Sequence, residues 1–187
     1  MEEKTKQYIL KLARRAIETY VRTGRIISRP KDYPSELNEK RGVFVTINKI
    51  FYGKPELRGC IGFPYPTKPL IDGIIEAAIS ATRDPRFPPL SEDELDKIKI
   101  EVSVLTEPKK VDGSVKEAVE KIIPFKHGVI IKKGFRSALF LPQVWDELPK
   151  KEVFLSQLCL KAGLPPDEWK KDGTEFYIFE AEIIEEK

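Results

Sequence analysis

The chain has 187 residues, of which 33 are Lys or Arg and 30 are Asp or Glu, so its formal net charge is only +3. Hydrophobic residues make up 41% of the chain, a share typical of a globular protein rather than a disordered one. No apolar run approaches the roughly 20 residues that span a bilayer, and the charged start Met1-Glu2-Glu3-Lys4 lacks a signal-peptide core. We therefore expect a cytoplasmic protein with one domain over residues 1–187.

Cysteine and histidine usage limits the metal and redox chemistry that we expect. Cys60 and Cys159 do not form a CxxC motif, and the single histidine, His127, is too little for a usual zinc site. The sequence also lacks a phosphate-binding loop, a GxGxxG fingerprint, an HExxH motif and an EF-hand loop. We expect no metal ion and no cofactor.

Basic residues are scattered along the chain. Pairs such as Lys109-Lys110 and Lys132-Lys133 have acidic residues nearby, so we interpret them as solvated faces. Because the excess of positive charge is small, the chain is not expected to bind nucleic acid.

The first half of the chain predicts a helix, a hairpin and a second helix. Apolar residues recur at helical spacing over residues 5–22 and again over residues 69–82. Between them, residues 43–61 predict two neighbouring antiparallel strands joined by the turn Gly53-Lys54-Pro55. Residues 28–41 contain prolines and many charges and predict a surface loop.

The second half predicts strands that alternate with short helices. Residues 98–104 show the cleanest period-2 alternation, residues 129–141 predict a hairpin, and residues 174–185 predict one long final strand. The Ser91/Glu94 and Ser114/Glu117 pairs predict capping boxes of short helices, and residues 153–162 predict another helix. Since βαβ units are absent, we expect an α+β fold with a mostly antiparallel sheet flanked by helices.

One stretch stands out chemically. Arg58 and Cys60 are two residues apart, which on a regular strand places both side chains on one face, and a fixed cation beside a thiol favours the thiolate. Gly59 permits close approach of another backbone. Residue types alone favour the alternative, a strand that ends in a glycine turn and buries Cys60 as a small apolar residue.

This stretch, Leu57-Arg58-Gly59-Cys60-Ile61-Gly62, resembles the six-residue signature of the AMMECR family. The resemblance runs from about residue 8 to 180, and it implies a compact α+β domain whose two lobes pack as one unit. The other matching stretches follow in the same order: Gly42-Val43-Phe44-Val45-Thr46, Asp84-Pro85-Arg86-Phe87-Pro88-Pro89-Leu90, Val102-Ser103-Val104-Leu105, His127-Gly128-Val129 and Leu141-Pro142.

Two hypotheses place function near this stretch. In the first, Arg58, Arg86, Asp84 and Gly59 bind an anionic small molecule or a modified peptide, with Cys60 as a nucleophile and His127 as its base. In the second, the domain is a non-catalytic interaction module that works with MEMO-type and radical-SAM proteins, as the resemblance implies. Nucleic-acid binding is the last alternative.

The composition also predicts heat adaptation. Charged residues reach 34% of the chain, with 15 prolines and one methionine, a balance found in proteins of thermophiles. Calorimetry should therefore give a melting midpoint above the range of roughly 45–65 °C that is usual for mesophile domains. A midpoint inside that range would contradict the expectation.

Overall fold

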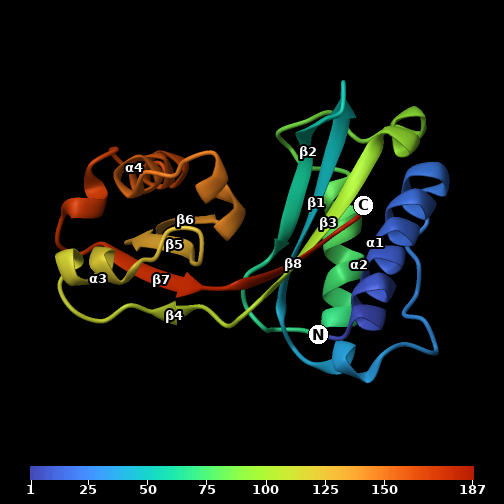
Figure 1. Cartoon of the computed structure of the whole chain (residues 1–187), viewed down its shortest axis with the longest axis horizontal. Helices are drawn as coiled ribbons and strands as arrows, with labels where there is room; N and C mark the ends of the chain where they lie inside the picture. Colours follow the sequence, from blue (N-terminus) through green and yellow to red (C-terminus); the bar gives the residue numbers. More distant parts are fainter. The chain divides into compact units, whose positions relative to one another are not determined.

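The structure is a computed structural model that describes residues 1–187 (Figure 1). The chain forms two compact units: unit 1 comprises Met1–Glu107 and Glu182–Lys187, and unit 2 comprises Pro108–Ala181. Unit 2 is therefore inserted into the sequence of unit 1. Two antiparallel four-stranded sheets with helices confirm the predicted α+β class.

Unit 1 is built on a sheet with the strand order β2-β1-β3-β8. Strand β1 is one of its two inner strands and pairs antiparallel with both β2 and β3. The helices α1 and α2 lie on one face of this sheet (Figure 1). The bounds are α1 Glu3–Thr23, β1 Gly42–Phe51, β2 Lys54–Phe63, α2 Leu70–Ala81, β3 Ile98–Leu105 and β8 Ala181–Glu185, with 3₁₀ helices η1 Ser35–Asn38 and η2 Glu92–Lys97.

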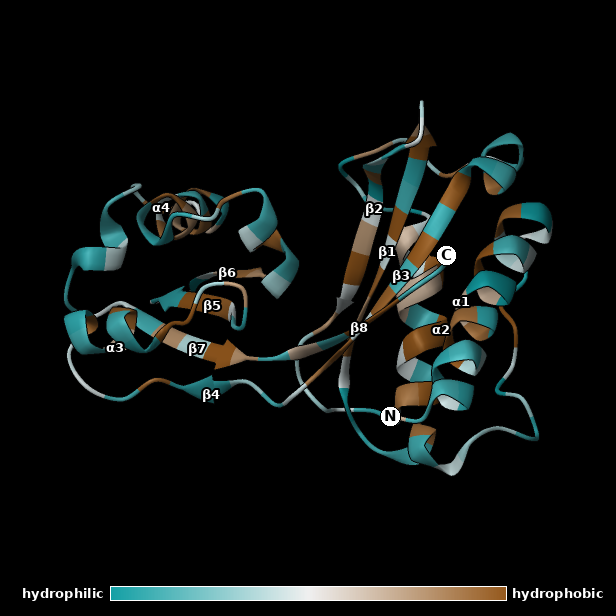
Figure 2. Ribbon diagram, in the orientation of Figure 1, coloured by the Kyte–Doolittle hydropathy of each residue, from teal (hydrophilic) through white to brown (hydrophobic).

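The core of unit 1 forms between this sheet face and the two helices. Alternate strand residues such as Val45, Ile47 and Ile100 are fully buried there, and they meet the apolar stripe of α2. Figure 2 shows hydrophobic and hydrophilic residues following one another along β1 and β3. The period-2 pattern of the strands therefore fixes which side chains point away from the helices, and Thr46 and Cys60 are among these.

Unit 2 has its own sheet, with the strand order β4-β7-β5-β6. Its core contains Trp145 stacked on Phe154, with ring centroids 3.6 Å apart and an interplanar angle of 4°. The bounds are β4 Lys109–Lys110, α3 Val115–Lys121, β5 Gly128–Lys133, β6 Arg136–Phe140, α4 Lys151–Lys161 and β7 Glu175–Phe179, with 3₁₀ helices η3 Pro142–Asp146 and η4 Glu168–Lys170.

Most predicted elements are present, with one instructive error. The single strand expected over residues 174–185 is two strands, β7 and β8, which belong to different sheets. Phe176 is buried in the core of unit 2 and Ile184 in the core of unit 1, whereas Ile183 is exposed. A single apolar run in the sequence does not show that the chain leaves one sheet after Phe179 and enters the other at Ala181. No helix in this structure combines the length and apolarity that a membrane span requires.

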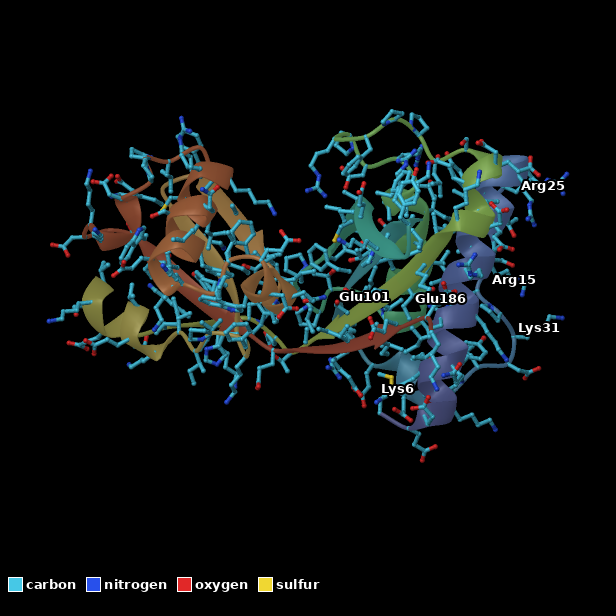
Figure 3. All side chains as sticks on the ribbon, turned by 45° about the horizontal axis from the view of Figure 1, so that its top comes forward. Lys6, Arg15, Arg25, Lys31, Glu101 and Glu186 are labelled. Atoms are coloured by element: carbon cyan, nitrogen blue, oxygen red, sulfur yellow. The ribbon has the colours of Figure 1, made fainter.

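A two-point ion pair between Arg14 and Glu186, called the fork below, joins the end of the chain to the first helix. The Arg14 guanidinium donates to both Glu186 carboxylate oxygens, at 2.6 and 2.7 Å, and to the carbonyl of Ile98. Glu186 also pairs with the backbone of Ile100 through its own N–H and its carboxylate. Hydrogen bonding to Glu186 raises the pKa of Arg14. Figure 3 labels Glu186 in unit 1.

This fork predicts a stability effect. Replacing Glu186 by Gln should lower the free energy of unfolding by about 1–3 kcal/mol, because half of a partly buried, charge-assisted pair is lost. Chemical denaturation measures this, and Glu185→Gln at the exposed neighbouring position is the matched control. Equal stability of the two variants would contradict a role for the fork.

Candidate anion-binding site around Cys60

Gly59 allows strand β2 to lie against the end of helix α2. A Cβ atom at position 59 would be 2.2 Å from the carbonyl oxygen of Ala81, the last residue of α2, and 3.5 Å from Cβ of Asp84. Only glycine fits this approach. The contact brings the loop after α2 alongside Cys60, so Gly59 acts in packing.

Asp84 in that loop connects the loop to the strand. Its side chain is only 1% exposed. One carboxylate oxygen accepts the backbone N–H of Cys60 at 2.9 Å, and the other accepts the backbone N–H of Arg86 at 3.0 Å. Because β2 is the edge strand, the carboxylate satisfies an amide that no neighbouring strand reaches.

The same carboxylate holds the guanidinium of Arg86. Nε donates to one Asp84 oxygen at 3.1 Å and Nη2 to the other at 2.8 Å, while the Arg86 side chain stays 52% exposed. Burial opposes ionisation of Asp84, but hydrogen bonds from the Arg86 side chain and from the Cys60 and Arg86 N–H groups outweigh it and lower its pKa to about 2. The pKa of Arg86 is raised, chiefly by Asp84, with a smaller contribution from Cys60.

The Cys60 thiol lies on the sheet face opposite the helices. Its Sγ accepts a hydrogen bond from the Thr46 hydroxyl at 3.3 Å, and Thr46 in turn is opposite Glu101 on β3. Cys60, Thr46 and Glu101 therefore form one row across three strands. The sequence interpretation did not select Glu101, although the alternation of residues 98–104 already placed it on the face away from the core.

Arg58 does not follow the simple alternation that predicted a shared face with Cys60. The register of β1 and β2 shifts so that Ile47 is opposite Gly59 while Asn48 is opposite Leu57, which leaves Arg58 as the extra residue. Since cross-strand partners share a face, Leu57 rather than Arg58 lies on the Cys60 face.

The Arg58 guanidinium instead binds Glu94 of η2. Nε and Nη2 each donate to a different Glu94 oxygen at 2.9 Å, and Lys49 adds a third ionic contact at 2.9 Å. Glu94 also accepts the N–H of Ser91 at 3.0 Å, as the capping box predicts. The hydrogen bond from Arg58 is the main cause that holds the pKa of Glu94 well below its usual range. Arg58 thus stabilises the segment that follows the Arg86 loop.

His127 belongs to unit 2, and its own hydrogen bonds argue for a structural role. Its Nδ1 accepts the N–H of Ile123 at 3.0 Å, and its carbonyl accepts the indole N–H of Trp145 at 2.7 Å. Burial lowers the pKa of His127, assisted by Lys126. A neutral imidazole whose Nδ1 accepts a hydrogen bond carries its proton on Nε2, so the free nitrogen is a donor rather than a base.

Exposed basic residues share a face of α1, in contrast with their scatter along the rest of the chain. Lys4, Lys11, Arg15 and Arg22 are exposed and recur at helical spacing. Arg15 and the nearby Arg25 are labelled in Figure 3. Glu18 also lies on α1 and pairs with Arg22, so this surface is partly neutralised.

No group of three or more His, Cys, Asp or Glu side chains is placed to hold a metal ion.

Three features define the class of protein. The stretch Leu57–Gly62 lies on the edge strand β2, Asp84 accepts a backbone N–H of that strand, and the chain forms two α+β units. The AMMECR1 family model matches residues 10–184, and the chain belongs to this family.

Several similar proteins come from thermophilic archaea. A protein of Thermococcus gammatolerans is 51% identical over 97% of this chain and 90% of its own length, and Protein MK0488 of Methanopyrus kandleri is 52% identical over 97% of this chain and 88% of its own. The crystal structure of Uncharacterized Protein PH0010 from Pyrococcus horikoshii superposes with a TM-score of 0.94 at 47% identity, covering 100% of this chain and 94% of that one. These sources agree with the composition that predicted heat adaptation.

The depressed pKa of Asp84 predicts how stability depends on pH. Its carboxylate contributes stability that is fully present above its ordinary pKa of 3.8 and is lost as pH falls toward the folded-state pKa of about 2. The contribution is about 2 kcal/mol. The free energies of unfolding of wild type and Asp84→Asn should therefore differ near pH 7. As the pH falls below 4, this difference should shrink by roughly 2 kcal/mol.

The exposed Asp96→Asn variant is the matched control for this measurement. A difference between wild type and Asp84→Asn that stayed constant from pH 7 to pH 2 would contradict the assignment.

Proposed function

We propose that unit 1 binds an anionic small molecule or a modified peptide at Arg86, beside Cys60. The observation that carries the proposal is a half-exposed guanidinium fixed by a buried carboxylate that also fixes the Cys60 backbone. Asp84 occupies the Nε–H and one N–H of Nη2. Of the five N–H donors of a guanidinium, the other three suit bidentate contact with a carboxylate or phosphate.

The residues of the proposed site have separate tasks. Arg86 binds the anion and Asp84 is a positioning residue that holds Arg86 and the edge of β2. Cys60 and Thr46 line the adjoining sheet face. Arg58 and Gly59 support the site from outside it, through Glu94 and through contact with α2.

A second candidate function uses Cys60 as a nucleophile. Two observations favour it: the positive charge of Arg86 interacts electrostatically with Cys60, and the Thr46 hydroxyl that bonds to Sγ can also donate to a thiolate. The hydrogen bonds of His127 leave it no free basic nitrogen, so this candidate does not depend on His127.

Anion binding can be tested with inorganic phosphate and acetate. Titration followed by the amide NMR signals of Cys60 and Arg86 should show saturable shifts, and Arg86→Gln should weaken binding at least about 5-fold, the loss expected for one charge-assisted contact. The matched control is Arg83→Gln, because Arg83 is an exposed arginine three residues away that lies against Tyr20. Equal affinity in the two variants would contradict the proposal.

Thiol reactivity separates the two candidate functions. The alkylation rate of Cys60 should exceed that of Cys159, which is fully buried and whose pKa is raised by burial. If Cys60 is an activated nucleophile, Arg86→Gln should slow its labelling near neutral pH, while His127→Ala leaves it unchanged. Labelling of Cys60 only on unfolding would exclude the nucleophile and leave the binding site.

A further inference from the structure

A groove of about 410 Å³ lies in unit 1 between helix α2 and the segment that follows helix α1. Gly24 ends α1 in the left-handed conformation, with φ of 70°, and the segment begins there. Ile26 and Ile27 of this segment and Ile75 and Ile79 of α2 line the groove. The groove has the size of a small-molecule site, and none of its lining residues belongs to the proposed anion site.

The apolar lining of the groove is partly open to solvent. Ile26 is 68% exposed, although isoleucine is among the residues most often buried, whereas Ile75 and Ile79 are only 7% and 4% exposed. The open apolar area therefore belongs chiefly to Ile26. A hydrocarbon chain that lies between Ile26 and α2 removes this area from water, which stabilises the bound state.

Both acidic side chains of the groove are already paired with a cation. Arg29 donates to both carboxylate oxygens of Asp72, with Nε at 2.9 Å, and Lys68 pairs with Glu76. Apart from an arginine at one end, the Ser80 hydroxyl is the remaining polar side chain of the lining. A peptide main chain is therefore a poor fit, because its N–H and C=O groups need partners, whereas a hydrocarbon chain needs none.

The arginine at the end of the groove, Arg83, forms no ion pair. Its guanidinium lies over the ring of Tyr20, 5.0 Å from the ring centroid, and this contact orients it while its N–H groups stay available to an anion. Arg83 follows the end of α2, where the carbonyls of Ile79 and Ser80 accept the N–H groups of Thr82 and Arg83. The groove thus has one uncompensated positive charge, and the helix-end carbonyls beside it are already hydrogen bonded.

We infer that this groove binds an aliphatic carboxylate, with the carboxylate on Arg83 and the hydrocarbon chain between Ile26 and the isoleucines of α2. Ile79 and Ile75 precede Arg83 by four and eight residues, which places them about 6 and 12 Å from it along the helix. A chain of medium length reaches both. The ligand satisfies the unpaired charge and covers the exposed isoleucine at the same time. This site is additional to the proposed anion site and uses a different arginine.

The test titrates octanoate and follows the amide NMR signals of Ile79 and Ser80, with butanoate, 1-octanol and acetyl-Leu-Leu as comparison ligands. Octanoate should bind at least about 10-fold more tightly than butanoate, because each buried methylene is worth about 4-fold. It should also bind more tightly than 1-octanol, which lacks the charge. Arg83→Gln and Ile26→Ser should each weaken octanoate binding at least about 5-fold. Both side chains are exposed, so both variants should melt near the wild-type midpoint.

The matched control is Arg25→Gln, because Arg25 is an exposed arginine next to Ile26 that does not line the groove. It should leave the octanoate affinity unchanged. Equal octanoate affinity in wild type and Arg83→Gln overturns the inference, and so does tighter binding of 1-octanol or acetyl-Leu-Leu than of octanoate. Neither result bears on the proposed anion site, because its test uses phosphate and acetate, which lack the long hydrocarbon chain, and follows different amide signals.

Discussion

The candidate site depends on one buried carboxylate. Asp84 is almost completely removed from solvent, yet it stays ionised because two backbone amides and a guanidinium converge on it. A buried charge of this kind is tolerated only when it is fully hydrogen bonded. Here those same bonds fix the edge strand, the loop after α2 and the position of Arg86, so the geometry of the whole site follows from satisfying a single charge.

The two arginines near Cys60 make similar ion pairs but differ in exposure. Arg58 is mostly buried and forms a two-point contact with Glu94, the N3 residue of the η2 capping box. Arg86 forms the same kind of contact with Asp84 but remains half exposed. Removing Arg58 would leave the buried Glu94 with one ionic partner fewer, and this cost falls on stability rather than on recognition.

Much of the fold could be predicted from the sequence because period-2 and helical patterns are strong in β3, α1 and α2. The face of Arg58 could not be predicted, because an extra residue between Leu57 and Gly59 changes the alternation without any mark in the residue types. Glu101 was missed for a related reason: its proximity to Cys60 exists only across three strands, which no local pattern reveals.

The insertion of unit 2 between Glu107 and Glu182 sets an order for synthesis on the ribosome. Unit 2 is made whole before β8, so it can fold while the sheet of unit 1 still has β3 as an unpaired edge and Arg14 has not met Glu186. Nascent unit 1 is thus exposed to edge-to-edge association until residues 181–186 emerge. Premature termination just before this segment would damage the half of the protein that was translated first.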